Sequence, residues 1–223
     1  MVLSSHMQTE HLSTKDGLTI VGDYYQGSRN CAVLLLHMMP ANRTSWQALA
    51  TQLQEHTFHV LTIDLRGHGE STGGPYGYQT FSDAEHKQSI FDIESSMEFL
   101  HSKGMKKIHI GGASIGANLA LQYAGQHPGV ASVMLLSPGL DYHGIHADIW
   151  IENLKPHQAI LLMASDDDIY SFTSVKTLFD CSSNLPKREV KLLSEAGHGT
   201  NVFKKNSGFI DELVVWLKKA DSS

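Results

Sequence analysis

The chain has 223 residues, of which 41% are hydrophobic and 18% charged, and its net charge is −6. This length predicts one domain with a full hydrophobic core rather than two domains. The negative charge and the scattered lysines argue against a nucleic-acid surface, and no apolar run approaches the roughly 18–20 residues that span a bilayer.

The first residues and the two cysteines bear on location. Residues 1–11 are expected to form a flexible, tag-like segment because Ser4-Ser5-His6-Met7 resembles an expression tag, and residues 12–220 to form the domain. Cys31 and Cys181 lie far apart in the sequence and are predicted to be free thiols. Because residues 1–7 show neither the basic region nor the apolar region of a signal peptide, a cytoplasmic location is expected, unless a signal segment has been removed. The sequence predicts no oligomeric state.

The first half of the chain alternates between predicted strands and helices. A hairpin is expected over residues 12–25, with its turn at residues 15–17. Apolar runs predict buried strands at residues 31–36 and 58–65. Between them, residues 42–57 carry apolar side chains at helical spacing. Glycines at positions 67, 69, 73 and 74 then predict a long loop.

The second half continues the alternation. Helices are predicted over residues 82–102, 115–126, 172–179 and 209–219, and strands over residues 107–113, 130–136, 159–163 and 189–193. This rhythm predicts an α/β fold: a mostly parallel sheet of about eight strands with helices on both faces. Catalytic groups are then expected beyond the carboxyl ends of the strands.

The segment between residues 137 and 159 is short. It has room for a loop and one helix around residues 146–154, so little or no cap and an open, shallow pocket are expected. Ile145, Ile149 and Trp150 are expected to belong to the core rather than to a roof over the pocket.

The most informative motif is Gly112-x-Ser114-x-Gly116, between a predicted strand and a helix of small residues. A serine on such a tight turn needs glycine neighbours, because side chains there would collide with nearby backbone. The turn places Ser114 at the N-terminus of the helix, where the amide of Ile115 can meet a developing oxyanion.

Three further motifs follow in an informative order. They are Leu34-Leu35-Leu36-His37, the stretch Asp64-Leu65-Arg66-Gly67-His68-Gly69-Glu70-Ser71, and Gly197-His198-Gly199. With the serine turn they resemble the α/β-hydrolase superfamily, from about residue 18 to residue 219, as a small, cap-poor, serine esterase-like member. The resemblance implies the order nucleophile, acid, histidine, with Ser114 as nucleophile and His198 as base. It implies neither a metal nor an organic cofactor.

The acid and the second oxyanion donor follow from the same resemblance. The family's spacing after the strand at residues 159–163 favours Asp168, with Asp167 and then Asp141 as alternatives and the unchosen neighbours as solvated turn residues. Residues 37–40 match the family's oxyanion loop, so Met39 would donate its amide beside that of Ile115. Met38 stands where relatives have glycine, and a positive φ there would be costly.

Two polar stretches are interpreted as structural. Residues 64–71 form a turn in relatives, and His37 is expected to hydrogen-bond its own loop. Residues 141–148 carry carboxylates and imidazoles, and are expected to form a polar rim rather than a metal site.

The resulting hypothesis is a serine hydrolase that cleaves carboxylic esters of short to medium acyl chain, with a small-molecule ester as its partner. The alternatives are a thioesterase, amidase or peptidase-like acyl hydrolase, because the same triad serves any acyl group. A ligand-binding member of the fold without turnover is the alternative from another class.

Overall fold

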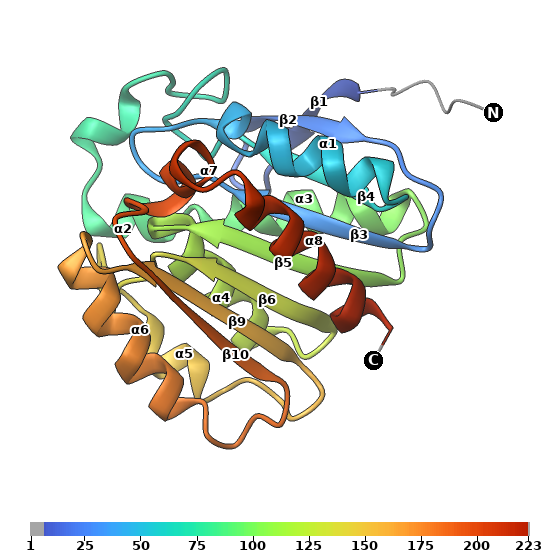
Figure 1. Cartoon of the computed structure of the whole chain (residues 1–223). Coiled ribbons are helices and arrows are strands. Elements are labelled where there is room, and N and C mark those ends of the chain that lie inside the picture. Colours follow the sequence, from blue (N-terminus) through green and yellow to red (C-terminus); the bar gives the residue numbers. More distant parts are fainter. Residues whose placement is uncertain (1–6, 223) are drawn as a thin grey trace.

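The computed structural model describes residues 7–222 (Figure 1). The strands are β1 (Met7–Ser13), β2 (Thr19–Tyr25), β3 (Cys31–Leu36), β4 (His59–Ile63), β5 (Lys107–Ala113), β6 (Val130–Leu136), β7 (Asp141–Tyr142), β8 (Ile145–His146), β9 (Ala159–Ser165) and β10 (Arg188–Leu193). The α-helices are α1 (Gln47–Glu55), α2 (Asp83–Lys87), α3 (Ile90–Ser102), α4 (Ile115–Gln126), α5 (Ala147–Ile151), α6 (Ile169–Cys181), α7 (Val202–Lys205) and α8 (Gly208–Asp221). Short 3₁₀ helices cover Arg43–Trp46, Gly77–Thr80 and Gly199–Asn201.

Eight of the strands form one twisted sheet in the order β1-β2-β4-β3-β5-β6-β9-β10. β2 runs antiparallel to β1 and β4. The other six strands of the sheet, β4, β3, β5, β6, β9 and β10, are parallel to one another. β7 and β8 form a separate antiparallel hairpin. The predicted sheet of about eight mostly parallel strands is therefore confirmed.

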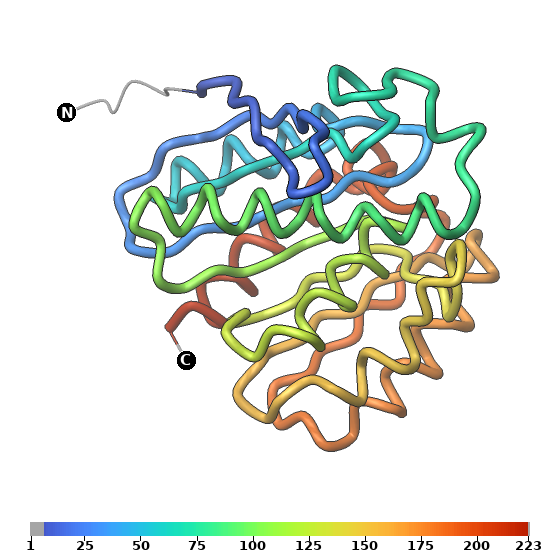
Figure 2. The backbone as a smooth tube through the Cα atoms, turned by 180° about the vertical axis from the view of Figure 1, so that it is seen from behind, coloured from blue at the N-terminus to red at the C-terminus, as the bar shows by residue number. Residues whose placement is uncertain are grey.

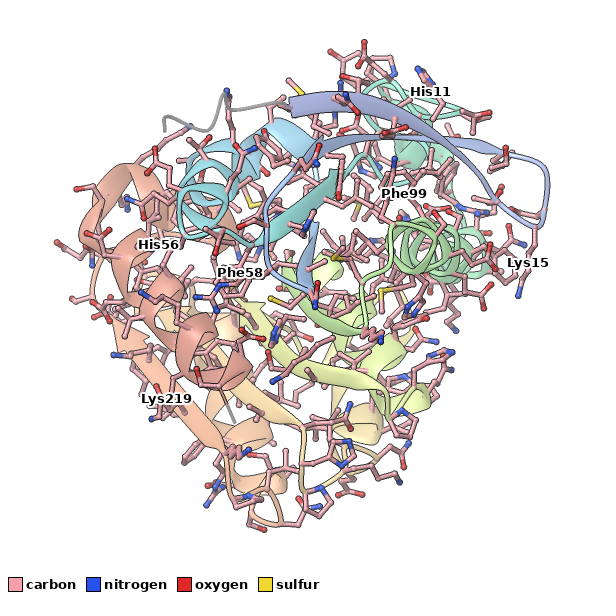
Figure 3. All side chains as sticks on the ribbon, turned by 90° about the vertical axis from the view of Figure 1, so that its right-hand side faces the viewer. His11, Lys15, His56, Phe58, Phe99 and Lys219 are labelled. Carbon is pink, nitrogen blue, oxygen red and sulfur yellow. The ribbon has the colours of Figure 1, made fainter. Side chains whose placement is uncertain are left out.

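Helices cover both faces of the sheet because the central strands are apolar on both sides. Along β3, Ala32, Leu34 and Leu36 pack with α3 and α4, whereas Val33 and Leu35 pack with α1 and α8. Figure 1 shows α1 and α8 in front of the sheet, and Figure 2 shows α3 and α4 behind it. The side view in Figure 3 places Phe58 inside the molecule and Lys15 and Lys219 at its outside. The two apolar layers fix the sheet as a scaffold.

The N-terminal boundary is a correction. β1 begins at Met7 and pairs with β2 through Met7 opposite Tyr25, so residues 7–11 belong to the sheet rather than to a tag-like segment. Residues 1–6 of that predicted segment lie outside the described residues. Buried and exposed side chains do not alternate clearly in this edge strand, because six of its seven residues keep contact with solvent.

The helix predicted over residues 82–102 is also wrong in one respect, since it is two helices. α2 begins with a capping box between Ser82 and Glu85, and α3 begins only at Ile90. Tighter hydrogen bonds from the amides of Gln88 and Ser89 to carbonyls three residues back close the first helix. The break lets α2 turn toward the end of the sheet that carries the functional side chains.

The carboxyl ends of the parallel strands lie level with one another. Leu36 of β3 pairs with Gly112 of β5, and Ala113 of β5 pairs with Leu136 of β6. Ser165 of β9 likewise pairs with Leu193 of β10. The loops that follow these strands therefore meet at one edge of the sheet.

Candidate active site

Ser114 stands on a sharp turn between β5 and α4. Its backbone has φ 55° and ψ −123°, a conformation that is strained for a residue with a side chain. Its amide donates to the carbonyl of Leu136 over 2.9 Å, and its carbonyl accepts the amide of Ala117 over 2.8 Å, so both neighbouring elements hold the turn. Ser114 is 7% exposed.

The flanking glycines are required by contact. A Cβ added at Gly112 would lie 2.1 Å from the carbonyl oxygen of Gly116. A Cβ added at Gly116 would lie 2.5 Å from the carbonyl oxygen of His37. Both distances are far below van der Waals contact, so the turn can be this tight only with glycine at these positions. The second contact also places the loop after β3 against the first turn of α4.

His198 and Asp168 are hydrogen-bonded to each other. His198 Nδ1 lies 2.6 Å from Asp168 Oδ2, and because a carboxylate only accepts, Nδ1 donates. Asp168 caps α6, with its other oxygen accepting the amide of Ser171 over 3.5 Å. This arrangement fixes the carboxylate on a helix and leaves His198 Nε2 as the basic nitrogen.

The loop that carries His198 packs directly beside the serine turn. The amide of Gly199 donates to Ser137 Oγ over 2.9 Å, and Ser137 lies at the end of β6. A Cβ added at Gly199 would lie 3.3 Å from Cβ of Ala113, the residue before Ser114. The structure thus brings the predicted nucleophile, base and acid to one place.

The other two aspartates of the run are exposed turn residues, as expected, and they also hold the same loop. Asp167 Oδ1 accepts the amide of Gly197 over 2.9 Å, and Asp166 Oδ1 accepts the amide of Glu195 over 2.8 Å. Hydrogen bonds from Ser165, from the Gly197 amide and from Lys205 lower the pKa of Asp167 to about 2.

Asp141, the third candidate acid, is directed elsewhere. It lies on β7 with its side chain half exposed, and its carboxylate lies 4.0 Å from His146 Nδ1 on the neighbouring strand. Of the three candidate acids, Asp168 is the one hydrogen-bonded to His198.

The two predicted oxyanion donors come from neighbouring segments. Ile115 is the first residue of α4, so its amide precedes the first hydrogen bond of the helix. Met39 lies in the loop after β3 that touches Gly116. Met38 is not among the described residues that have a positive φ. The loop therefore forms without the conformation that would be costly at Met38.

His37 holds this loop, as expected. Its Nδ1 donates to the carbonyl of Met38 over 2.9 Å, and its Nε2 accepts the amide of Leu65 over 3.0 Å. Burial lowers the pKa of His37 to about 3, with His68 adding to the effect. The imidazole is therefore neutral at pH 7 and acts as a cross-link between two loops.

The stretch from residue 64 to residue 71 is also structural, as expected. The buried carboxylate of Asp64 accepts the amides of Arg43 and Glu70 and pairs with the Arg43 guanidinium. Arg66 pairs with buried Asp92 over 2.8 Å. Asp64 and Arg66 are thus paired with charges on neighbouring elements, Arg43 before α1 and Asp92 on α3, so neither is available for acid or base chemistry.

The short segment after β6 contains an element that the sequence analysis missed. The β7–β8 hairpin carries Tyr142, whose hydroxyl lies 3.2 Å from Ser171 Oγ. Burial raises the pKa of Tyr142, while the hydrogen bond with Ser171 opposes that rise. Ile145 and Trp150 join the core as expected, but Ile149 is 55% exposed, which corrects its assignment to the core.

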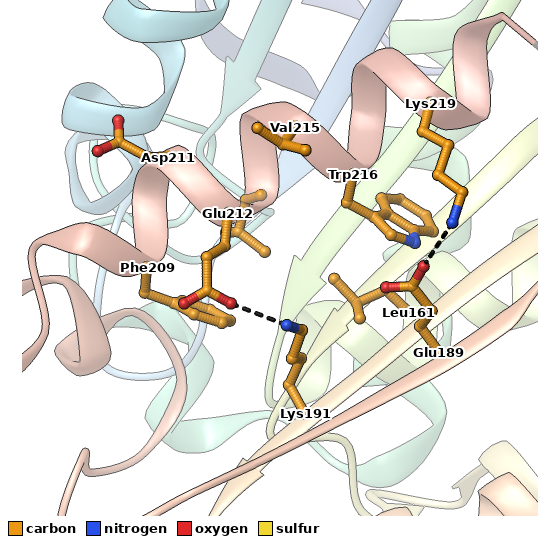
Figure 4. Close-up of a pocket in the computed structure, with 10 residues that line it drawn as sticks. Leu161, Glu189, Lys191, Phe209, Asp211, Glu212, Val215, Trp216 and Lys219 are labelled. Carbon is orange, nitrogen blue, oxygen red and sulfur yellow. Dashed lines mark hydrogen bonds and ion pairs between the residues drawn. The ribbon is translucent and has the colours of Figure 1, made fainter.

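Two cavities help to place the site. A groove of about 340 Å³ lies between β10 and α8, where Lys191 pairs with Glu212 over 2.9 Å (Figure 4). None of its lining residues is a predicted site residue. A cleft of about 600 Å³ opens beside the oxyanion loop, and its lining includes Met38 and Pro40 from that loop and Thr200 just after His198. The second cavity therefore lies beside the oxyanion loop, and Ser114 and His198 are not among its lining residues.

Residues 7–222 hold neither a metal-binding cluster nor a membrane-spanning helix. In this part of the chain no group of three His, Cys, Asp or Glu side chains is arranged to hold a metal ion. Within the same range, none of the helices combines the length and the apolar character needed to cross a bilayer. Cys31 and Cys181 are free thiols, as predicted.

Three supporting residues had no clear signal in the sequence: Ser137, Tyr142 and Asn118. Ser137 follows a buried strand, but a serine there is unremarkable until Gly199 is seen beside it. Asn118 is a fully buried amide inside an otherwise apolar helix, which is the one anomaly that could have marked it.

Comparisons with known proteins agree with this fold. A family model described as alpha/beta hydrolase fold matches residues 32–163. Lipase 1 of Psychrobacter immobilis is 30% identical over 141 residues, which are 62% of this chain and 41% of that protein. Monoacylglycerol lipase abhd6-B of Xenopus laevis is 29% identical over 115 residues, 50% of this chain and 32% of the relative. The matched part thus spans less than half the length of these curated relatives.

Solved structures of similar shape cover nearly the whole chain. The esterase Pf2001 of Pyrococcus furiosus superposes with a TM-score of 0.81 at 17% identity, covering 96% of this chain and 91% of that one. An esterase from Exiguobacterium antarcticum gives a TM-score of 0.74 at 15% identity, covering 95% and 100%. At these identities the likeness is one of fold.

Proposed function

Because this chain belongs to the alpha/beta hydrolase fold family, we propose that it is a serine hydrolase that cleaves carboxylic esters through Ser114, His198 and Asp168. The observation that carries the proposal is the 2.6 Å hydrogen bond between His198 Nδ1 and Asp168 Oδ2, in a loop packed beside the strained Ser114 turn. A carboxylate, an imidazole and a serine in this order are the parts of an activated nucleophile.

In the proposed reaction Ser114 Oγ attacks the ester carbonyl carbon and passes its proton to His198 Nε2. The amides of Ile115 and Met39 would donate to the carbonyl oxygen as it becomes negative. His198 then gives the proton to the departing alcohol, which leaves an acyl-enzyme. Water loses a proton to His198, adds to the acyl carbon and releases the acid, and Ser114 recovers that proton.

The acyl preference is part of the proposal. The segment between β6 and β9 holds only a two-stranded hairpin and α5, so no large cap encloses a long chain. The cleft beside the oxyanion loop is lined by Met38, a soft apolar side chain, and by polar residues. These features favour short to medium acyl chains. The relatives described above, a lipase among them, are in keeping with ester hydrolysis.

Two alternatives use the same site. A thioesterase, amidase or peptidase-like activity would need the same triad and would differ in its leaving group. A binding protein without turnover would keep the fold with an unreactive Ser114. The unpaired thiols of Cys31 and Cys181 favour a reducing, cytoplasmic setting for any of these.

The test is hydrolysis of p-nitrophenyl acetate, butyrate and octanoate by the wild type and by Ser114→Ala. We expect turnover in the wild type, highest with acetate or butyrate, and none above background in Ser114→Ala. Labelling by a fluorophosphonate should occur in the wild type and disappear in Ser114→Ala. Equal slow rates in both proteins without labelling would contradict the proposal, and a maximum at long chains would contradict the acyl preference alone.

A further inference from the structure

β10 is the last strand of the sheet, so one long side of it faces away from the other strands. At the end of its pairing with β9, the carbonyl of Leu193 accepts the amide of Asp166 over 3.0 Å. Backbone groups alternate in direction along a strand, so those of Arg188, Val190 and Leu192 face outward. Their N–H and C=O groups are directed toward a position that no strand of residues 7–222 occupies.

The side chains of β10 differ between its two faces. Glu189 and Lys191 point to the face of α8 and line the groove between this helix and the strand. Val190 points to the other face, where it packs on the core under α6. Leu192 follows on that same face and is 45% exposed. The edge therefore offers charges on one face and apolar surface on the other.

α8 leaves this edge open. The helix packs against β6, which lies two strands inward from β10. Two ion pairs span the groove of about 340 Å³ between helix and strand, Lys191 with Glu212 over 2.9 Å and Glu189 with Lys219 over 3.2 Å (Figure 4). An open strand edge is a template for pairing with a further strand.

The two charges of β10 are spaced to match an antiparallel copy of the same strand. About a two-fold axis through Val190, Glu189 lies opposite the partner's Lys191, and Lys191 lies opposite the partner's Glu189. Opposite charges at directly opposed positions stabilise a sheet. The same register sets Arg188 opposite the partner's Leu192 and Val190 opposite its own copy. All the outward backbone groups of these three residues then form hydrogen bonds across the axis.

The neighbouring registers are disfavoured by the same charges. An axis through Lys191 would oppose two lysines, and an axis through Glu189 would oppose two glutamates, and like charges directly opposed destabilise a sheet. The two ion pairs that span the groove cancel in charge, although the chain as a whole carries −6. Two copies therefore meet at this edge with paired charges rather than with the acidic surface that would hold them apart.

We propose that two copies of this chain pair through β10, antiparallel and with the two-fold axis at Val190, so that their sheets join into one continuous sheet. Across the groove face, Lys219, Glu189, the partner's Lys191 and the partner's Glu212 then alternate in sign, twice by symmetry. On the other face the exposed Leu192 lies against the partner's Val190. The inference goes beyond the proposed hydrolase function and does not depend on it.

The first measurement is sedimentation velocity of the wild type from about 5 to about 200 µM. We expect the mass to rise from 24.6 kDa toward twice that value. Glu189→Lys and Lys191→Glu each place like charges opposite one another in the pairing. Each variant alone should therefore dimerise about tenfold or more weakly than the wild type.

The decisive sample is an equimolar mixture of the two variants. In a mixed dimer the introduced lysine faces the introduced glutamate, and the native Lys191 faces the native Glu189. We therefore expect the mixture to dimerise at concentrations at which each variant alone is a monomer. Because only folded chains can pair in this way, recovery in the mixture also shows that both variants are folded.

Glu55→Lys and Lys106→Glu are the matched controls. They make the same changes of charge at exposed positions, at the end of α1 and just before β5. We expect both to dimerise as the wild type does. A wild type that stays at 24.6 kDa throughout would overturn the proposal and would leave the edge to a strand of another protein. Single variants that dimerise as the wild type does, or a mixture that stays monomeric, would overturn it as well.

Discussion

The amide of Gly197 donates a hydrogen bond of 2.9 Å to Asp167 Oδ1, one residue before the candidate base His198. It is one of a ladder of four hydrogen bonds that join two loops. Asp166 accepts the amide of Glu195 and Ser165 Oγ accepts the amide of Ala196. Asp168 accepts the Nδ1 proton of His198. Four consecutive residues, the last of β9 and the three that follow it, therefore set the position of the loop after β10.

This ladder predicts different losses for neighbouring aspartates. Asp168→Asn should lower kcat by on the order of 10⁴-fold, since the amide would leave the imidazole in the wrong tautomer. Asp167→Ala should lower kcat by only about tenfold, because it loosens the loop without touching the ring. Ester hydrolysis by the two variants measures both effects. A larger loss in Asp167→Ala than in Asp168→Asn would reverse the assignment of the acid.

Ser137 offers a second test of loop position. It lies in the left-handed region with φ 51° and accepts the amide of Gly199. Ser137→Ala leaves that amide unpaired and should cost about 1–3 kcal/mol of unfolding free energy. Ser137→Gly loses the same bond but relieves the backbone strain, so it should unfold at higher denaturant concentration than Ser137→Ala. Both variants should lose activity equally, and full activity in Ser137→Gly would show that strain rather than the hydrogen bond matters.

The tight contact between Gly116 and the oxyanion loop predicts a selective loss of activity. Gly116→Ala would force the His37 carbonyl away and should lower kcat by about 10²-fold or more, the effect of losing an oxyanion donor. Gly129→Ala is the control, because a Cβ at Gly129 meets nothing within 4 Å and should change stability by less than about 0.5 kcal/mol. Equal activities in the two variants would contradict the placement of the oxyanion loop.

His37 gives a pH dependence of stability. Its folded pKa of about 3 lies below the ordinary value of 6.5, so between these values the unfolded chain binds a proton that the native state does not. The unfolding free energy is therefore highest above pH 6.5 and falls with the pH toward 3, by at most about 1.4 kcal/mol per pH unit from this residue.

The measurement is urea unfolding of the wild type and His37→Asn from pH 7.5 to pH 4. The variant should be less stable at pH 7.5 and should show a shallower decline below pH 6.5. His68 and His86 also have lowered pKa values and contribute to the decline in both proteins, so the difference between the two slopes isolates His37. Identical slopes would mean that His37 is charged in the native state.

The sequence by itself determined the scaffold and the serine turn. β3, β5, α4 and β6 begin and end at the predicted residues, because a continuous apolar run has one stable place between two layers of helices. The need for glycine at positions 112 and 116 could also be predicted from the sequence, since the steric demand of a tight turn around Ser114 is local.

Only the tertiary structure decided what supports the site. The bonds from Asp167 to Gly197, from Ser137 to Gly199 and from Asn118 to Gly139 join residues that are 21 to 62 positions apart. The spacing of residues along the sequence does not predict such pairs, because a polar side chain in a loop meets its partner only when the sheet brings the strand ends together. The same reason explains why the Tyr142 hydroxyl meets Ser171 of α6, although nothing in the segment around Tyr142 marks it for that place.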